Sequence, residues 1–180
     1  MTYDVVLLVE KVLTEQDARQ VTGLHEELET DQRVTYHVLM PVEDAAARVE
    51  AAMGSLAAGE VMASPALVMS EVDLAKVRQE CVERSQQDLA TTIRLIKEAG
   101  GHAEGRLVHE HPIDALAQVV AEIDGREAII LTRPHVVAEF FHVDWTSRAR
   151  RKIGVPVLHL LEHETIEEQS AGGGEGVSGA

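Results

Sequence analysis

The feature that most constrains the fold is a short run of consecutive apolar residues that recurs between helical patterns. Val5 to Val9 and Ala128 to Leu131 are apolar at every position. A strand that is apolar on both of its faces has to be covered on both faces, which is typical of a parallel sheet enclosed by helices. These runs therefore predict an α/β domain.

Extended and helical patterns alternate along the chain. Strands are expected at residues 5–9, 33–42, 103–109, 128–131 and 155–161, and helices at residues 14–29, 43–58, 71–99, 112–124 and 144–152. Such alternation favours parallel strands that are joined by crossover helices. We therefore predict a doubly wound, Rossmann-like parallel sheet of five strands in the order 3-2-1-4-5, with helices on both faces.

The chain is expected to contain one domain and a tail. Its 180 residues fit one α/β domain, which we place at residues 1–165. Residues 166–180 form the tail, which ends in a stretch of mostly Gly, Ser and Ala from Ser170 to Ala180. Such a segment buries too little apolar surface to order itself, so we expect the tail to be disordered.

The charge of the chain argues against several classes of partner. There are 31 acidic and 16 basic residues, which gives a formal net charge of -15. This field repels nucleic acid and anionic membrane surfaces, and no apolar run approaches the roughly 20 residues that span a bilayer. The N-terminus lacks the features of a signal peptide, and a single cysteine, Cys81, fits a reducing compartment. We expect a cytoplasmic protein with no nucleic-acid or membrane partner.

The segment after the fourth predicted strand has a distinctive spacing. It reads Leu131-Thr132-Arg133-Pro134-His135, then nine residues, then Trp145-Thr146-Ser147. This spacing resembles the Gly-x2-Gly-x9-Gly-(Ser/Thr) loop of universal stress proteins. The segment Ile153-Gly154-Val155-Pro156-Val157-Leu158 is similar to the last strand of that family, and Glu10 stands where its first strand usually ends in Asp.

The resemblance implies a degenerate nucleotide site between the first and fourth strands. Its residues would be Glu10, Thr132, Arg133, His135, Trp145, Thr146 and Ser147. The three glycine positions are occupied by Thr132, His135 and Trp145, so backbone N–H groups lose their close approach to a phosphate. Family members without the glycines are thought not to bind ATP, so the resemblance implies that neither ATP nor another cofactor binds here.

Several of these residues also have a purely structural interpretation. Thr146 and Ser147 either bind an anion at a helix N-terminus or cap that helix. Arg133 either contacts a ligand or lies in the loop, and Glu10 is either a ligand contact or a solvated strand end. The basic residues from Arg148 to Lys152 either form an anion patch or complement a helix C-terminus. For Thr146, Ser147 and the basic residues we favour the helix-end interpretation. We expect Arg133 to lie in the loop without contacting a ligand, and Glu10 to be a solvated strand end.

No catalytic or metal-binding motif is found in the sequence. It has no Gly-x-Ser-x-Gly elbow, no phosphate loop and no Cys-x-x-Cys, and its histidine pairs lack a third ligand at suitable spacing. We therefore predict a non-enzymatic protein that resembles universal stress proteins, acts in a stress response and does not bind ATP. The alternative is a module that binds a nucleotide or another small ligand in the altered cleft.

The last predicted strand is expected to form a dimer interface. The segment from Val155 to Leu161 is strongly apolar, and Pro156 favours an edge position or the start of a strand. An exposed apolar edge tends to recruit a partner strand. The family resemblance also implies dimerisation through this strand, so we predict a homodimer.

Deleting residues 170–180 is expected to leave the thermal stability unchanged, because this segment has no large apolar side chain to bury. Melting curves of the full chain and the truncated chain, followed by circular dichroism, test this. A fall of several degrees in the melting temperature of the truncated chain would show that the tail docks on the domain.

Overall fold

The computed structural model describes residues 2–26, 32–43, 71–132 and 151–161. The strands are β1 (Thr2–Val9), β2 (Arg33–Pro41), β3 (His102–Val108), β4 (Glu127–Thr132) and β5 (Val157–Leu161). The helices are α1 (Glu15–Gly23), α3 (Glu71–Glu98) and α4 (Pro112–Ile123). The predicted helix at 43–58, most of that at 144–152 and the tail lie outside the described residues.

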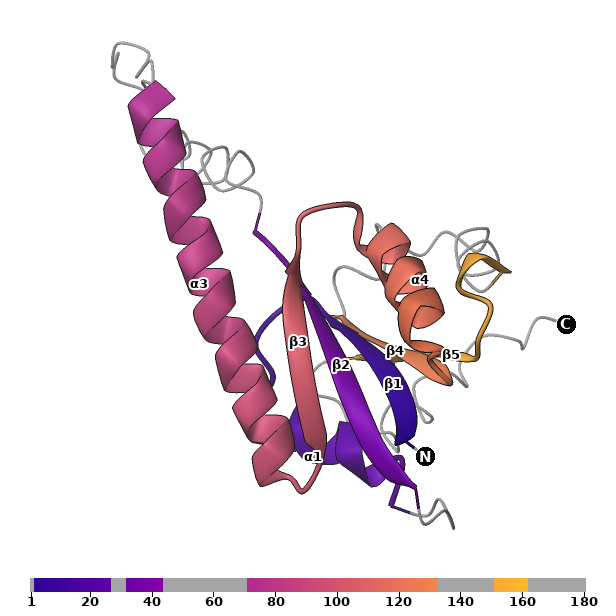
Figure 1. Cartoon of the computed structure of the whole chain (residues 1–180). Coiled ribbons are helices and arrows are strands. Elements are labelled where there is room, and N and C mark those ends of the chain that lie inside the picture. The colour runs from indigo at the N-terminus through magenta and orange to yellow at the C-terminus, as the bar shows by residue number, and fades with distance from the viewer. Residues whose placement is uncertain (1, 27–31, 44–70, 133–150, 162–180) are drawn as a thin grey trace, which may run out of the picture.

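The five strands form one parallel sheet in the order β3-β2-β1-β4-β5. This confirms the predicted fold class and strand order. Figure 1 shows α1 and α3 on one face of the sheet and α4 on the other, so helices cover both faces. Within the described ranges, no helix is both long enough and apolar enough to cross a bilayer.

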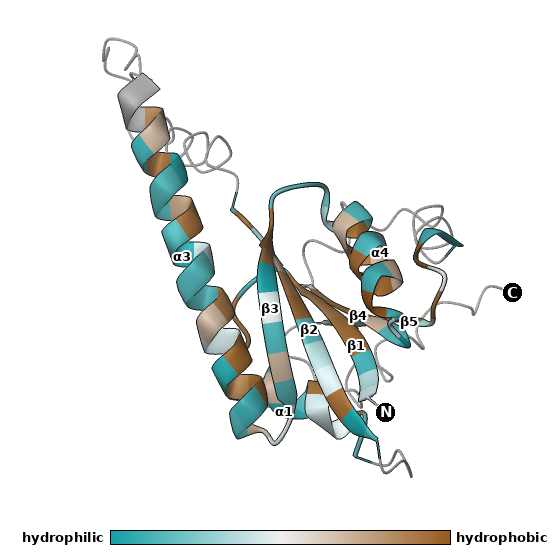
Figure 2. Cartoon of the chain, in the orientation of Figure 1, coloured by the Kyte–Doolittle hydropathy of each residue, from teal (hydrophilic) through white to brown (hydrophobic). Residues whose placement is uncertain are grey.

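The core consists of two layers that share β1. Val5, Leu7 and Val9 are fully buried in the layer that also contains residues of α1 and α3. Val6 and Leu8 belong to the layer of α4. Figure 2 shows hydrophobic residues along β1 and β4. The unbroken apolar run therefore serves both layers at once, as its lack of alternation predicts.

Helix α1 begins with a capping box. The Thr14 hydroxyl accepts from the backbone N–H of Asp17 at 3.2 Å, and the Asp17 carboxylate accepts from the backbone N–H of Thr14 at 2.9 Å. The prediction that this helix starts after Thr14 is confirmed. Its predicted end at residue 29 is wrong, because the helix ends at Gly23 and the following turn directs His25 into the protein.

The C-terminal end of α3 is fixed by two glycines. Gly100 has a positive φ of 91°, and its N–H donates to the carbonyl oxygen of Lys97, while the N–H of Gly101 donates to that of Ile96. This pair of bonds is a Schellman motif, which confirms the predicted helix stop. In β3, a Cβ on Gly105 would lie 2.8 Å from Leu89 Cδ1, so the glycine permits the close approach of α3 to the sheet.

Helix α4 starts at Pro112 as predicted but ends in a different way. The sequence suggests Gly125 as the terminating residue, whereas the left-handed residue is Asp124, with a φ of 53°. Aspartate tolerates this conformation better than most residues do because of its short polar side chain. Gly125 follows it and donates its N–H to the carbonyl oxygen of Val120.

Strand β5 lies at one edge of the sheet, directly after Pro156. The predicted edge position is therefore confirmed, although the strand begins at Val157 and not at Val155. Leu160 is buried in the core, while Leu158 is 40% exposed. The two leucines are two residues apart and therefore point to the same face of the edge strand, where Leu160 is covered and Leu158 is partly exposed.

A buried polar network lies at the amino-terminal edge of the sheet. The Nδ1 atom of His25 is 2.8 Å from the Tyr36 hydroxyl oxygen, and its Nε2 atom is 2.8 Å from Oε1 of Glu127. The Tyr3 hydroxyl donates to Oε2 of Glu127 at 3.1 Å. The hydrogen bond from His25 lowers the pKa of Glu127 below its ordinary value, and burial raises the pKa of Tyr36. One carboxylate therefore connects β1, β4 and the end of α1.

Replacing Glu127 with Gln is expected to lower the free energy of unfolding by about 1–3 kcal/mol at neutral pH, because two donors then face one acceptor. Since the folded-state pKa of Glu127 is lowered, its stabilisation is present above the ordinary glutamate pKa and is lost as the pH falls through the lowered value. Urea unfolding of the wild type should show this loss, and the Glu127→Gln variant should show a flatter acid limb.

The matched control for this experiment is Glu80→Gln, at an exposed position on α3. It should leave both the free energy of unfolding and its pH dependence unchanged. If the wild type and both variants lose stability with the same pH dependence, the network does not contribute as described.

Candidate functional site

The carboxyl ends of β1, β2 and β4 meet at one edge of the sheet, where ligands of doubly wound folds usually bind. The backbone pairing continues past the strand ends. The N–H of Glu10 donates to the carbonyl oxygen of Leu131 at 3.3 Å, and the N–H of Val42 donates to that of Val108 at 2.9 Å. These bonds fix the points at which the loops leave the sheet.

Two of the predicted site residues, Glu10 and Thr132, lie in the described part of the chain. Glu10 directly follows β1, and Thr132 is the last residue of the neighbouring strand β4. The Thr132 hydroxyl oxygen is 2.8 Å from Nε2 of His159 on β5, and burial lowers the pKa of that histidine. The Thr132 side chain is therefore directed toward β5. The other predicted residues, Arg133, His135, Trp145, Thr146 and Ser147, lie outside the described residues.

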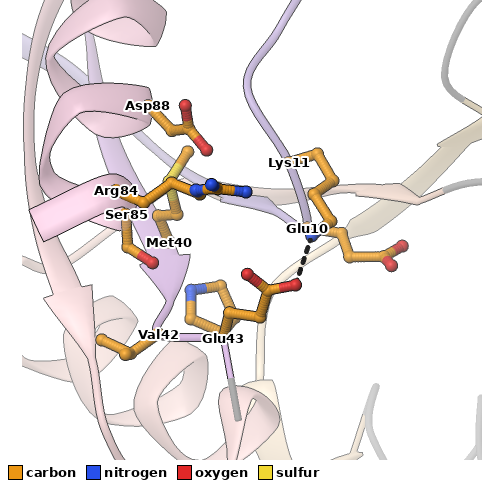
Figure 3. Close-up of a pocket in the computed structure, with 9 residues that line it drawn as sticks. Glu10, Lys11, Met40, Val42, Glu43, Arg84, Ser85 and Asp88 are labelled. Carbon is orange, nitrogen blue, oxygen red and sulfur yellow. Dashed lines mark hydrogen bonds and ion pairs between the residues drawn. The ribbon is translucent and has the colours of Figure 1, made fainter. Parts of the chain in front are cut away.

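A pocket formed by described residues lies one strand over from the predicted cleft, between the ends of β1 and β2 and the middle of α3 (Figure 3). Its volume is about 190 Å³. Of the two predicted site residues that the structure describes, Glu10 lines this pocket and Thr132 does not. The lining residues are Glu10, Lys11, Met40, Pro41, Val42, Glu43, Arg84, Ser85 and Asp88.

The α3 wall of this pocket presents three polar side chains from one helix face. Asp88 lies one turn after Arg84 and Ser85, at the i+4 and i+3 positions, and Figure 3 shows the three side chains facing the strand ends. Ser85 is only 5% exposed. Within the described ranges, none of these three side chains has a hydrogen bond or an ion pair with another residue.

The strand-end wall carries an ion pair and an apolar base. The Nζ atom of Lys11 lies 3.5 Å from Oε1 of Glu43, and the dashed line in Figure 3 marks this contact. In the same view the carboxylate of Glu10 points away from α3. Met40 is buried and supplies apolar surface together with Val42.

The charge around the pocket is mixed. Glu10, Glu43 and Asp88 place three carboxylates on the lining, against the two cations Lys11 and Arg84. The formal excess is therefore one negative charge, and Lys11 is already paired with Glu43. A polyanion would be repelled by this lining, whereas a ligand with charges of both signs would be accommodated.

Sequence reasoning located the strand-end edge but missed the residues of α3. The available signal is that Ser85 and Asp88 interrupt the apolar stripe of the long helix, next to Arg84. A polar interruption on a buried helix face indicates a cavity or a site. The sequence does not reveal which turn of α3 passes the end of β2, so this signal alone does not locate the pocket.

The other residues that the sequence suggests as functional candidates, where the structure describes them, have structural roles. Cys81 is buried on α3, in keeping with a small core residue. Lys152 donates to Oδ1 of Asp114 at 2.6 Å, and this bond lowers the pKa of Asp114. Arg148 and Arg150 lie outside the described residues. In the part of the chain that the structure describes, no group of three His, Cys, Asp or Glu residues could hold a metal ion.

Neither a protein-family model nor a curated protein matches this sequence. Solved structures do resemble it. The universal stress protein from Archaeoglobus fulgidus has a TM-score of 0.50 and 13% identity, and the match covers 88% of this chain and 94% of that one. The hypothetical protein MJ0577 has a TM-score of 0.57 and 10% identity, with 92% and 100% covered.

A third neighbour is a universal stress protein family protein from Arabidopsis thaliana, solved with AMP bound. It has a TM-score of 0.50 and 13% identity, and the match covers 89% of this chain and 92% of that one. At these identities the likeness establishes the fold alone. The chain therefore has the fold of universal stress proteins, as the spacing of its sequence indicates.

Proposed function

We propose that this chain is a non-enzymatic, cytoplasmic homodimer of the universal stress protein type that acts in a stress response and does not bind ATP. The shared fold supports the type, although fold by itself does not determine function. A single buried cysteine is compatible with a reducing compartment, which supports the cytoplasmic location. The site and the edge strand support the other two parts.

The charge at the carboxyl edge of the sheet is the observation that carries the proposal about ATP. The Arabidopsis neighbour is solved with AMP, so a protein of this fold can hold an adenine nucleotide. In this chain, Glu43 and Asp88 line the pocket at that edge, and Thr132 is hydrogen-bonded to His159. Carboxylates repel the phosphates of ATP, and the replaced glycines deny them close backbone N–H groups.

The wild type is expected to show no ATP binding by isothermal titration calorimetry at millimolar concentration. The triple change Thr132→Gly, His135→Gly, Trp145→Gly should restore weak binding near 1 mM, or about -4 kcal/mol, because glycine allows backbone N–H groups to approach phosphate oxygens. The matched control changes the same three residues to Ala, which removes the bulk without the backbone freedom. It should bind less well than the glycine variant.

Tight ATP binding by the wild type would contradict this part of the proposal. A folded glycine variant that binds no ATP would show that the site has diverged beyond its loop, with Glu10 the next residue to change.

The exposed edge of the sheet supports the proposed dimer. Strand β5 pairs with β4 on one side, and no strand in the described part of the chain pairs with its other side. Among the described residues, Leu158 is the exposed large hydrophobic side chain, while Leu160 is used in the core. A symmetric pairing of two β5 edges would cover both the free backbone groups and Leu158.

The variant Leu158→Glu is expected to shift the protein from dimer to monomer, because a two-fold interface would bring two carboxylates together. Light scattering at micromolar concentration gives the mass. The control is His102→Glu, an exposed position on the opposite edge strand β3, which should leave the mass unchanged. A monomeric wild type would rule out the proposed dimer.

A further inference from the structure

Ser85 is a largely buried residue of α3 that lines the pocket. The residue is 5% exposed, and among the described residues its hydroxyl has no hydrogen-bond partner. Figure 3 shows the oxygen directed toward the strand ends. Because its oxygen faces the pocket, this hydroxyl can donate a hydrogen bond to a molecule there or accept one from it.

The two charged residues beside Ser85 are also unpaired. Arg84 and Asp88 are four residues apart on α3, where opposite charges commonly form an ion pair, yet they form none. Two other pairs with this spacing do, Arg19 with Glu15 and Arg94 with Glu98. Arg84 is exposed and Asp88 is partly exposed, so both side chains are accessible to a ligand that carries both signs of charge.

The chemistry of these side chains defines such a ligand. A guanidinium binds a carboxylate through two parallel hydrogen bonds, and a carboxylate accepts from an ammonium group. Arg84 would hold the ligand carboxylate and Asp88 the ligand ammonium group. The Ser85 hydroxyl, on the same wall of the pocket, can donate to the carboxylate or accept from the ammonium group.

The size and the base of the pocket limit the rest of the ligand. A volume of about 190 Å³ is below that of pockets which hold drug-sized molecules, roughly 300–1,000 Å³. Met40 and Val42 offer apolar surface at the end of β2. The ligand body should therefore be small and aliphatic.

We propose that the pocket formed by α3 and the ends of β1 and β2 binds a small aliphatic zwitterion, of the kind represented by an aliphatic α-amino acid. Arg84 recognises its carboxylate, Asp88 and Ser85 recognise its ammonium group, and Met40 and Val42 contact its side chain. This site goes beyond the proposed function, because it requires neither ATP nor a second subunit.

Calorimetric titration of the full chain with L-leucine tests the proposal, with two analogues that each lack one charge. These are 4-methylpentanoate, without the ammonium group, and 3-methylbutylamine, without the carboxylate. L-Leucine is expected to bind, and each analogue should bind at least about tenfold more weakly, because each loses one charge-assisted contact. Absence of leucine binding, or an analogue that binds as tightly as leucine, overturns the proposal.

Variants identify the residues that read each charge. Arg84→Gln and Asp88→Asn should each weaken L-leucine binding at least about tenfold, and Arg84→Gln should also reduce the preference for L-leucine over 3-methylbutylamine. Arg94→Gln, on the same helix but outside the pocket, should bind like the wild type. Leucine binding that is unaffected by Arg84→Gln overturns the assignment.

Melting curves will show whether each variant is folded. If a variant is not, the titrations of the wild type with L-leucine and its two analogues still test the proposal. Failure here is distinct from failure of the proposed function. ATP binding by the wild type would contradict the proposed function and leave a leucine result standing, whereas absence of leucine binding would leave the ATP result standing.

Discussion

The complete burial of β1 is the constraint on which the rest of this structure depends. The strand lies between β2 and β4, and its side chains from Val5 to Val9 are buried, alternately in the two layers of the core. A strand in this position leaves no room for a polar side chain along its central part, because an unpaired polar group there would be costly. Along β1, polar side chains are therefore confined to the two ends of the strand.

The two ends of the sheet use their polar residues in different ways. At the amino-terminal edge, His25 and Glu127 are joined to each other and to two tyrosine hydroxyls, so the buried groups satisfy one another. Such a network fixes the position of the elements that it connects. At the carboxyl edge, Arg84, Ser85 and Asp88 have no partner among the described residues. The network of His25 and Glu127 is therefore structural, whereas Arg84, Ser85 and Asp88 are the residues of the proposed binding site.

Much of the fold could be predicted because its signals are local. The unbroken apolar runs, the capping box at Thr14 and the glycines after α3 each determine their own element within a few residues. The errors also have local causes. His25 leaves the apolar periodicity of α1 to bond with residues of β2 and β4, and Asp124 takes the left-handed conformation that the sequence suggests for Gly125. The partners of His25 lie 11 and 102 residues away, so no local pattern reveals them.

The pocket could not be predicted because its position depends on how α3 is placed along the sheet. A glycine of β3, Gly105, contributes to that placement because it leaves room for a side chain of α3. A Cβ on Gly105 would lie 2.7 Å from the carbonyl oxygen of Val38 and 2.8 Å from Leu89, so the glycine allows Leu89 of α3 to lie against β3. Helix α3 runs antiparallel to the strands, and one turn toward its N-terminus from Leu89 is Ser85. The close approach at Gly105 therefore brings Ser85 to the level at which β2 ends after Met40. Gly105, which lies outside the pocket, thus contributes to the placement of the helix that forms one of its walls.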